Sequence, residues 1–138
     1  MSSPITLEER LDYILGRIQK ATIKAGRKPK EITLVGVTKS FPIEIWEQAL
    51  NANLSTLGEN RIQEAYKKAD TFLKRDKIEL HFIGHLQSNK VRKAVKLFDV
   101  IQTVDSIGLA EKIDRICKER HKKQSIYLQL KSGADPNK

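Results

Sequence analysis

The chain has 138 residues and a formal net charge of +9, from 26 lysine and arginine residues against 17 aspartate and glutamate residues. This length suits one domain with a single core, and no apolar run approaches the roughly 20 residues of a membrane-spanning helix. Cys117 is the only cysteine, which excludes an internal disulfide, and the N-terminus lacks a secretory signal pattern, so we expect a cytoplasmic protein.

The hydrophobic pattern predicts helices that alternate with strands. A capping box at Thr6 begins the first helix, which Gly26 ends, and Pro42 lies near the first turn of the second helix. Ser88 and Ser106 are the predicted N-caps of two later helices. The predicted elements in chain order are a helix from Thr6 to Gly26, a strand at 32–38, a helix after Pro42, a strand at 56–58, a helix at 61–75, a strand at 80–84, a helix at 88–97, a strand at 100–104, a helix after Ser106 and a strand at 126–130.

Five strands separated by helices predict an α/β fold with a parallel sheet covered by helices. Two architectures fit this order, an open doubly wound sheet and part of a (β/α)8 barrel. A complete barrel typically needs about 250 residues, so this chain cannot close one. The number of strands leaves both architectures open.

Conspicuous polar residues follow the predicted strands directly. Lys39 follows the first strand and Asn60 the second, while His85 follows the third and Ser106 the fourth. In both architectures, ligands bind at the C-terminal ends of parallel strands. These residues therefore form the candidate site.

Lys39 offers the most specific chemistry of this set. Strand alternation places it on the same face as Val35 and Val37. If that face is interior, desolvation lowers the lysine pKa from about 10.4, and the neutral amine can attack an aldehyde. The alternative is an ordinary exposed lysine at the end of a strand.

The other polar residues each allow two interpretations. Asn60 can orient a polar ring substituent or serve as a helix N-cap. His85 can contact a planar ligand or bond to a neighbouring loop, whereas His81 is expected to be a buried structural group. Glu59 is expected to bind a helix end or an arginine, and Gly84 to relieve crowding where helix meets strand.

Several other classes of site are not indicated. The histidines and the cysteine have no zinc spacing, and the phosphate-loop and dinucleotide-binding glycine patterns are absent. Basic residues alternate with apolar ones at helical spacing, as on exposed helix faces, and aromatic residues make up only 6% of the chain. We therefore do not expect a nucleic-acid partner, and a small anionic ligand explains the positive charge equally well.

Three blocks of sequence resemble the YggS-like pyridoxal 5′-phosphate (PLP) homeostasis family. The second and third blocks are long and specific, and the resemblance runs from the first helix to Gly133. The blocks are 35–39 (Val-Gly-Val-Thr-Lys), 58–64 (Gly-Glu-Asn-Arg-Ile-Gln-Glu) and 81–90 (His-Phe-Ile-Gly-His-Leu-Gln-Ser-Asn-Lys), with a fourth match at 102–106 (Gln-Thr-Val-Asp-Ser).

This resemblance implies a (β/α)8 barrel like the N-terminal domain of alanine racemase, with PLP held as a Schiff base on Lys39. Asn60, His85 and Ser106 are the further cofactor-binding residues that it implies. It also implies a carrier or regulator of intracellular PLP and vitamin B6 without an established turnover reaction, so no catalytic residue is assigned. The alternatives are a PLP-dependent, racemase-like enzyme acting on amino acids and, less favoured, a basic nucleic-acid-binding domain.

The chain departs from this family towards its C-terminus. Family members continue for roughly another half barrel, which carries loops that grip the phosphate, and Ser132 with Gly133 is a weak substitute. We therefore expect residues 1–138 to be the N-terminal part of an alanine racemase-like PLP-binding barrel domain. Because five strands leave two edges and an apolar surface uncovered, we expect self-association or a complementary C-terminal segment.

Overall fold

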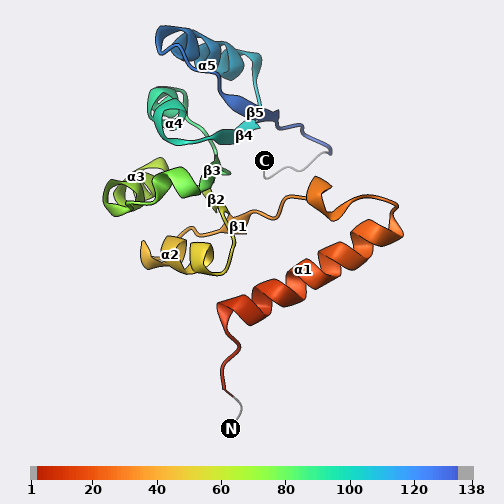
Figure 1. Cartoon of the computed structure of the whole chain (residues 1–138). Coiled ribbons are helices and arrows are strands. Elements are labelled where there is room, and N and C mark those ends of the chain that lie inside the picture. The colour runs from red at the N-terminus through yellow and green to blue at the C-terminus, as the bar shows by residue number, and fades with distance from the viewer. Residues whose placement is uncertain (1–2, 134–138) are drawn as a thin grey trace.

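The computed structural model describes residues 3–133, and within them five helices and five strands follow one another (Figure 1). The helices are α1 (Leu7–Lys24), α2 (Glu44–Asn51), α3 (Ile62–Thr71), α4 (Val91–Leu97) and α5 (Ile107–Glu119). The strands are β1 (Gly36–Val37), β2 (Thr56–Glu59), β3 (Glu79–Phe82), β4 (Val100–Val104) and β5 (Ser125–Leu128). Short 3₁₀ turns are η1 (Pro29–Glu31), η2 (Arg75–Lys77) and η3 (Ser88–Lys90).

The order of the strands decides between the two predicted architectures. All neighbouring strands pair in parallel, in the sequential order β1-β2-β3-β4-β5. A doubly wound sheet reverses its strand order at a switch point, whereas a (β/α)8 barrel adds each strand beside the last. The structure is therefore a partial (β/α)8 barrel, which confirms the predicted α/β class.

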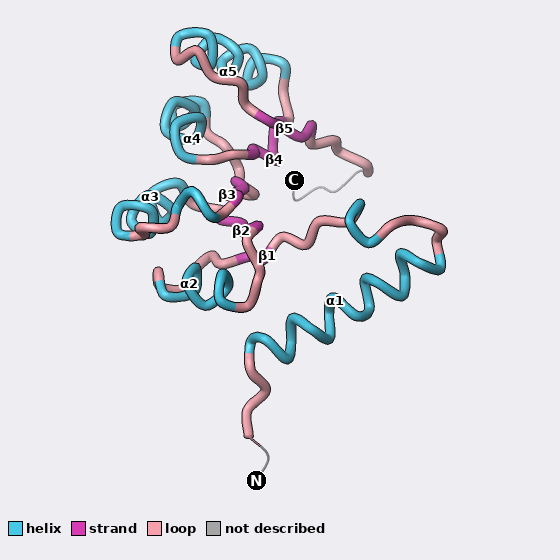
Figure 2. Tube along the Cα trace, in the orientation of Figure 1, coloured by secondary structure: helices cyan, strands magenta, loops and turns pink. Residues whose placement is uncertain are grey.

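Helices α2 to α5 cover one face of this sheet (Figure 2). The register aligns Leu57 with Leu80, and Glu59 with Phe82 and Ile101, so these side chains form rows on the helix-facing side. Residues at alternate positions face the opposite side. The core thus lies between the sheet and α2–α5, where its largest fully buried side chains include Trp46, Phe82, Phe98, Leu57, Leu80 and Ile101.

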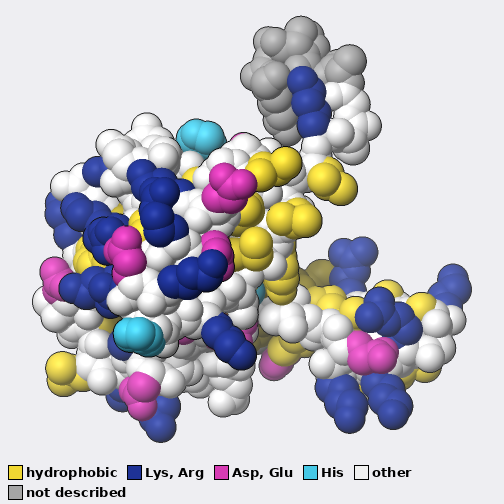
Figure 3. Space-filling view, turned by 90° about the horizontal axis from the view of Figure 1, so that it is seen from above, with side chains coloured by type: hydrophobic (Ala, Val, Ile, Leu, Met, Phe, Trp, Pro, Cys, Tyr) yellow, Lys and Arg dark blue, Asp and Glu magenta, His cyan; other side chains and the backbone are white. Residues whose placement is uncertain are grey.

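The opposite face of the sheet is not covered by a comparable layer. Val37 and Tyr127 lie on this face and are 49% and 56% exposed. Figure 3 shows hydrophobic side chains gathered on this side of the body, towards the separate helix α1. Helix α1 has the predicted capping box at Thr6 but buries only Leu11 and Thr22. The uncovered face of the sheet and the apolar side of α1 therefore have no packing layer among residues 3–133.

Two local predictions were wrong. Within the predicted strand 32–38, only Gly36 and Val37 pair with β2, because an edge strand has a single neighbour to fix its length. Ser88 lies inside η3 rather than at a helix N-cap, and its hydroxyl accepts a hydrogen bond from Lys112 Nζ at 3.1 Å. No helix in the described part of the chain is long and apolar enough to cross a membrane.

Candidate functional site

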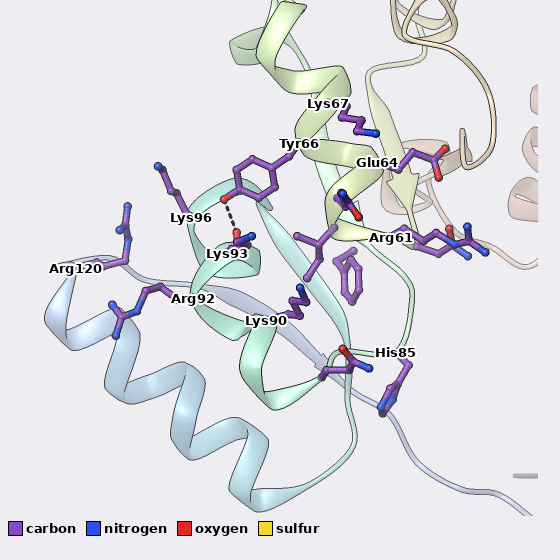
Figure 4. A pocket seen from close by; sticks show the side chains of 15 residues that line it. Arg61, Glu64, Tyr66, Lys67, His85, Lys90, Arg92, Lys93, Lys96 and Arg120 are labelled. Carbon is purple, nitrogen blue, oxygen red and sulfur yellow. Dashed lines mark hydrogen bonds between the residues drawn. The ribbon is translucent and has the colours of Figure 1, made fainter.

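The four candidate residues lie along the carboxyl edge of the sheet. Lys39 follows β1, Asn60 follows β2, His85 comes after β3 and Ser106 follows β4. Asn60 and His85 line one groove beside α3 and α4 (Figure 4). Lys39 and Ser106 lie at the same edge but do not line that groove. The sequential parallel order thus brings together residues that are far apart in the chain.

Lys39 is exposed, contrary to the expectation of an apolar wall around it. It lies in a turn with Ser40, whose φ of +67° is in the left-handed region. Val37, on the same strand face, is also exposed because no layer covers that side of the five-stranded sheet. The structure therefore matches the alternative interpretation of a lysine that emerges from a strand end into solvent.

A buried polar network fixes the residue that precedes Lys39. Lys68 Nζ donates to the main-chain oxygen of Thr38 at 2.7 Å and to Glu59 Oε1 at 2.5 Å. The Thr38 hydroxyl donates to Glu59 Oε1 at 2.8 Å, and Trp46 Nε1 donates to the Thr38 hydroxyl at 3.1 Å. The predicted partner of Glu59, a helix end or an arginine, is therefore wrong: a lysine on the sheet-facing side of α3 takes that place.

A second contact fixes the residue that follows Lys39. The main-chain N–H of Ser40 donates to Glu64 Oε1 at 2.6 Å, and that oxygen lies 3.4 Å from Lys68 Nζ. Hydrogen bonds to charged groups are stronger than neutral ones. The turn is thus held on both sides of Lys39, and the Lys39 side chain itself is exposed.

The side chain of Asn60 has no structural hydrogen bond among the residues that the structure describes. It is not the N-cap of α3, because the structure assigns that position to Arg61, and its amide makes no hydrogen bond within residues 3–133. A Cβ added at Gly84 would lie 2.2 Å from the main-chain oxygen of Asn60. Gly84 therefore allows the loop that carries His85 to approach Asn60, which confirms its predicted role in relieving crowding.

The two histidines differ as predicted. His85 is exposed and has no hydrogen-bond partner within residues 3–133. His81 is 2% exposed; its Nε2 lies 2.6 Å from Glu79 Oε1 and its Nδ1 lies 2.8 Å from Gln102 Nε2. His81 is therefore a structural group, and His85 is the histidine available to a ligand.

Ser106 is confirmed as the N-cap of α5. Its hydroxyl oxygen accepts a hydrogen bond from the Leu109 N–H at 3.1 Å. A hydroxyl has a further acceptor lone pair and a proton to donate, so capping does not exhaust its hydrogen-bonding capacity. No group of His, Cys, Asp or Glu side chains suited to a metal ion occurs among residues 3–133.

The sequence prediction missed Lys68 and Glu64, which hold the Lys39 turn. One signal for Lys68 was present: Ile62, Ala65 and Lys68 recur on one side of α3, and all three are buried. A lysine on the apolar stripe of an amphipathic helix needs a buried partner. Glu64, one turn before Lys68, gave only the common pattern of an i,i+4 pair.

Curated proteins resemble this chain over most of its length. A pyridoxal phosphate homeostasis protein of Aquifex aeolicus is 36% identical over 94% of this chain and 57% of its own length. A Synechocystis protein of the same name is 43% identical over 80% of this chain and 50% of its own length. The chain thus spans about half the length of these relatives. No family model matches it.

Solved structures share the fold. PipY of Synechococcus elongatus, solved with PLP bound, superposes with a TM-score of 0.75 and 36% identity, over 86% of this chain and 56% of PipY. Alanine racemase of Clostridium difficile superposes with a TM-score of 0.63 over 83% of this chain and 30% of the racemase. At 18% identity, this second likeness shows the fold alone.

The sequential parallel sheet, with polar residues at its carboxyl edge, defines this molecule as a barrel-type α/β protein of the alanine racemase N-terminal fold. Sequence and fold agree on a closer relationship. Over the half of their length that it spans, the chain is a member of the pyridoxal phosphate homeostasis family, as its motifs indicated.

Proposed function

We propose that this chain binds PLP through a Schiff base on Lys39. The observation that carries this proposal is the lysine at the end of β1, in a chain that superposes on PipY, a protein solved with PLP bound. The amine nitrogen attacks the aldehyde carbon, a carbon–nitrogen double bond forms and the carbonyl oxygen leaves as water. An exposed amine on a turn fixed at Thr38 and Ser40 is accessible to such an aldehyde.

Three further residues fit the same ligand. The unused amide of Asn60 offers a hydrogen bond to a polar ring substituent, and the exposed imidazole of His85 can contact a planar ring. Ser106 retains a hydroxyl proton to donate. We propose these three as cofactor-binding residues beside Lys39.

The wider role follows from the family. We propose that residues 1–138 are the N-terminal part of an alanine racemase-like PLP-binding barrel domain and that the protein contributes to PLP and vitamin B6 homeostasis in the cytoplasm. A carrier of this kind needs no catalytic residue of its own. Its chemistry is the reversible capture of an aldehyde.

Absorption spectroscopy tests the proposal directly. Addition of PLP to the full chain is expected to give the visible band of a protein Schiff base, and borohydride reduction should fix the cofactor on the peptide that contains Lys39. Lys39→Ala should abolish both signals. Lys24→Ala, a matched loss of an exposed lysine on α1, should leave them unchanged. An undiminished band in Lys39→Ala would overturn the assignment.

We also propose that the open face of the sheet is covered by a second copy of the chain or by a complementary C-terminal segment. Val37 on β1 and Tyr127 on β5 are exposed apolar side chains of this face, and β1 and β5 each have an unpaired edge within the described sheet. Analytical ultracentrifugation should show concentration-dependent association. A monodisperse monomer that binds no hydrophobic dye would contradict this proposal.

A further inference from the structure

A groove between α3 and α4 reaches the carboxyl edge of the sheet at Asn60 and His85 (Figure 4). Its volume is about 1210 Å³, above the roughly 300–1,000 Å³ typical of small-molecule pockets, so it suits loose capture more than tight enclosure. Glu64 is the only carboxylate that lines it within the described chain. The cationic side chains that line this groove, here named the basic groove, are Arg61, Lys67, Lys90, Arg92, Lys93, Lys96 and Arg120.

The charges of the basic groove are largely uncompensated. Among its cations, only Arg92 forms an ion pair within residues 3–133, at 2.8 Å from Glu119. Lys67, Lys90 and Lys93 are exposed and have no carboxylate partner there. Like charges gathered on a concave surface create a positive potential that attracts anions.

The groove adjoins the Lys39 turn. Asn60 and His85 belong both to the candidate cofactor site and to the groove lining. Glu64 lines the groove as well, and its carboxylate accepts the hydrogen bond from the Ser40 N–H, next to Lys39. Glu64 thus connects the groove to the turn that carries Lys39.

The aromatic lining of the groove does not suit nucleic-acid bases. Phe82 is 1% exposed, and Tyr66 is partly buried with its hydroxyl donating to the main-chain oxygen of Lys93 at 2.9 Å. Binding of single strands generally uses exposed aromatic faces on which bases stack. The groove therefore favours an anion recognised by charge.

We infer that the basic groove captures the phosphate of the incoming cofactor and makes the chain selective for a phosphorylated aldehyde over the same aldehyde without phosphate. The inference rests on the proposed binding of PLP at Lys39. A phosphate monoester carries a charge of about −1.5 to −2 at neutral pH, and attraction of this kind raises encounter rates by about 10- to 1,000-fold. This gain in encounter rate falls as ionic strength rises, because salt screens exposed charges.

Stopped-flow absorption measures the inferred selectivity. The full chain is mixed with PLP or with pyridoxal, which has the same aldehyde and no phosphate, at low and high ionic strength. In the triple variant Lys67→Ala, Lys90→Ala and Lys93→Ala, the apparent second-order rate constant for PLP at Lys39 should fall about fivefold or more at low ionic strength. The rate constant for pyridoxal should not change.

Two further variants separate charge from structural damage. Replacement of the same three lysines by arginine keeps the charge and should keep the rate with PLP. The matched triple variant Lys20→Ala, Lys24→Ala and Lys30→Ala removes the same charge from α1 and η1, outside the groove, and should also keep it.

Three outcomes would overturn the inference while the proposed function stands: an unchanged rate with PLP in the groove variant, an equal loss for both aldehydes, or an equal loss in the α1–η1 variant. One further outcome would contradict the proposed function itself. If neither aldehyde gives a band that depends on Lys39, both proposals fall.

Discussion

Lys68 and Glu59 form a buried ion pair beside the turn that carries Lys39, with 2.5 Å between Nζ and Oε1. The two side chains are 5% and 0% exposed. The other carboxylate oxygen of Glu59 has no hydrogen-bond partner within residues 3–133. Because a buried charge is tolerated only when it is paired, each member of the pair depends on the other.

Removal of the lysine from this pair should destabilise the fold strongly. Lys68→Met leaves the Glu59 carboxylate buried without its cation, which is expected to reduce the free energy of unfolding by about 3–5 kcal/mol. Urea unfolding measures the change, followed by the fluorescence of Trp46, the only tryptophan and a fully buried one.

The neighbouring lysine supplies the control for this prediction. Lys67→Met alters an exposed side chain on the same helix and should change stability by less than about 0.5 kcal/mol. The double variant Lys68→Met with Glu59→Leu should regain much of the loss, because it buries no unpaired charge. Equal effects of Lys67→Met and Lys68→Met would contradict the role of the pair.

The contact between Ser40 and Glu64 predicts a protected amide next to Lys39. The Ser40 N–H donates to Glu64 Oε1 at 2.6 Å, and a net contribution of about 1.5–3 kcal/mol for a charged hydrogen bond corresponds to tenfold or more in exchange rate. Glu64→Ala should therefore speed hydrogen exchange of this amide at least about tenfold, as measured by NMR. Glu111→Ala, at an exposed position on α5, should leave the rate unchanged.

The close approach at Gly84 predicts a sharp difference between two glycines. In Gly84→Ala the new Cβ would meet the main-chain oxygen of Asn60 at 2.2 Å, so the melting temperature should fall, with overpacking costing about 1–3 kcal/mol. Gly108 lies in α5 with no atom within 4 Å of an added Cβ. Gly108→Ala should be neutral or stabilise the helix by up to about 1 kcal/mol. A harmless Gly84→Ala would show that the loop carrying His85 can move away from Asn60.

Cys117 predicts a pH dependence of stability in the alkaline range. Burial raises the pKa of its thiol above the ordinary value of 9.0, and nearby Lys122 offsets part of this rise. Above pH 9 the unfolded chain loses the thiol proton first, so the folded state holds more protons. The stability due to this group is complete below that pH and is lost as pH rises through the folded pKa.

The variant Cys117→Ala tests the direction in which stability changes with pH. Its stability should decline less steeply than that of the unchanged chain when urea unfolding is compared from neutral pH to above pH 9. The thiol should also react slowly with alkylating reagents in the folded chain, since the side chain is 8% exposed. Rapid alkylation without unfolding would argue against burial at this position.

Local sequence patterns predicted the order of elements well. The capping box at Thr6 and the N-cap at Ser106 appear as expected, because each depends on contacts between residues near in sequence. The strand at 100–104 also appears as predicted, from its run of apolar and β-branched residues. The predictions failed at 32–38 and at Ser88. At 32–38 an edge strand has only one neighbour with which to pair, and at Ser88 the chain forms η3 before α4 begins.

The sequence by itself determined the alternating helices and strands, the polar residues that end each strand and the relationship to the family, since these depend on residue types and their spacing. Only the tertiary structure decided that the strands lie in sequential order, that Lys39 is exposed and that Lys68 holds its turn. It also decided that lysines from α3 and α4 line a single groove. The physical reason is that burial and charge clustering depend on which segments pack together, and residues far apart in the chain determine that packing.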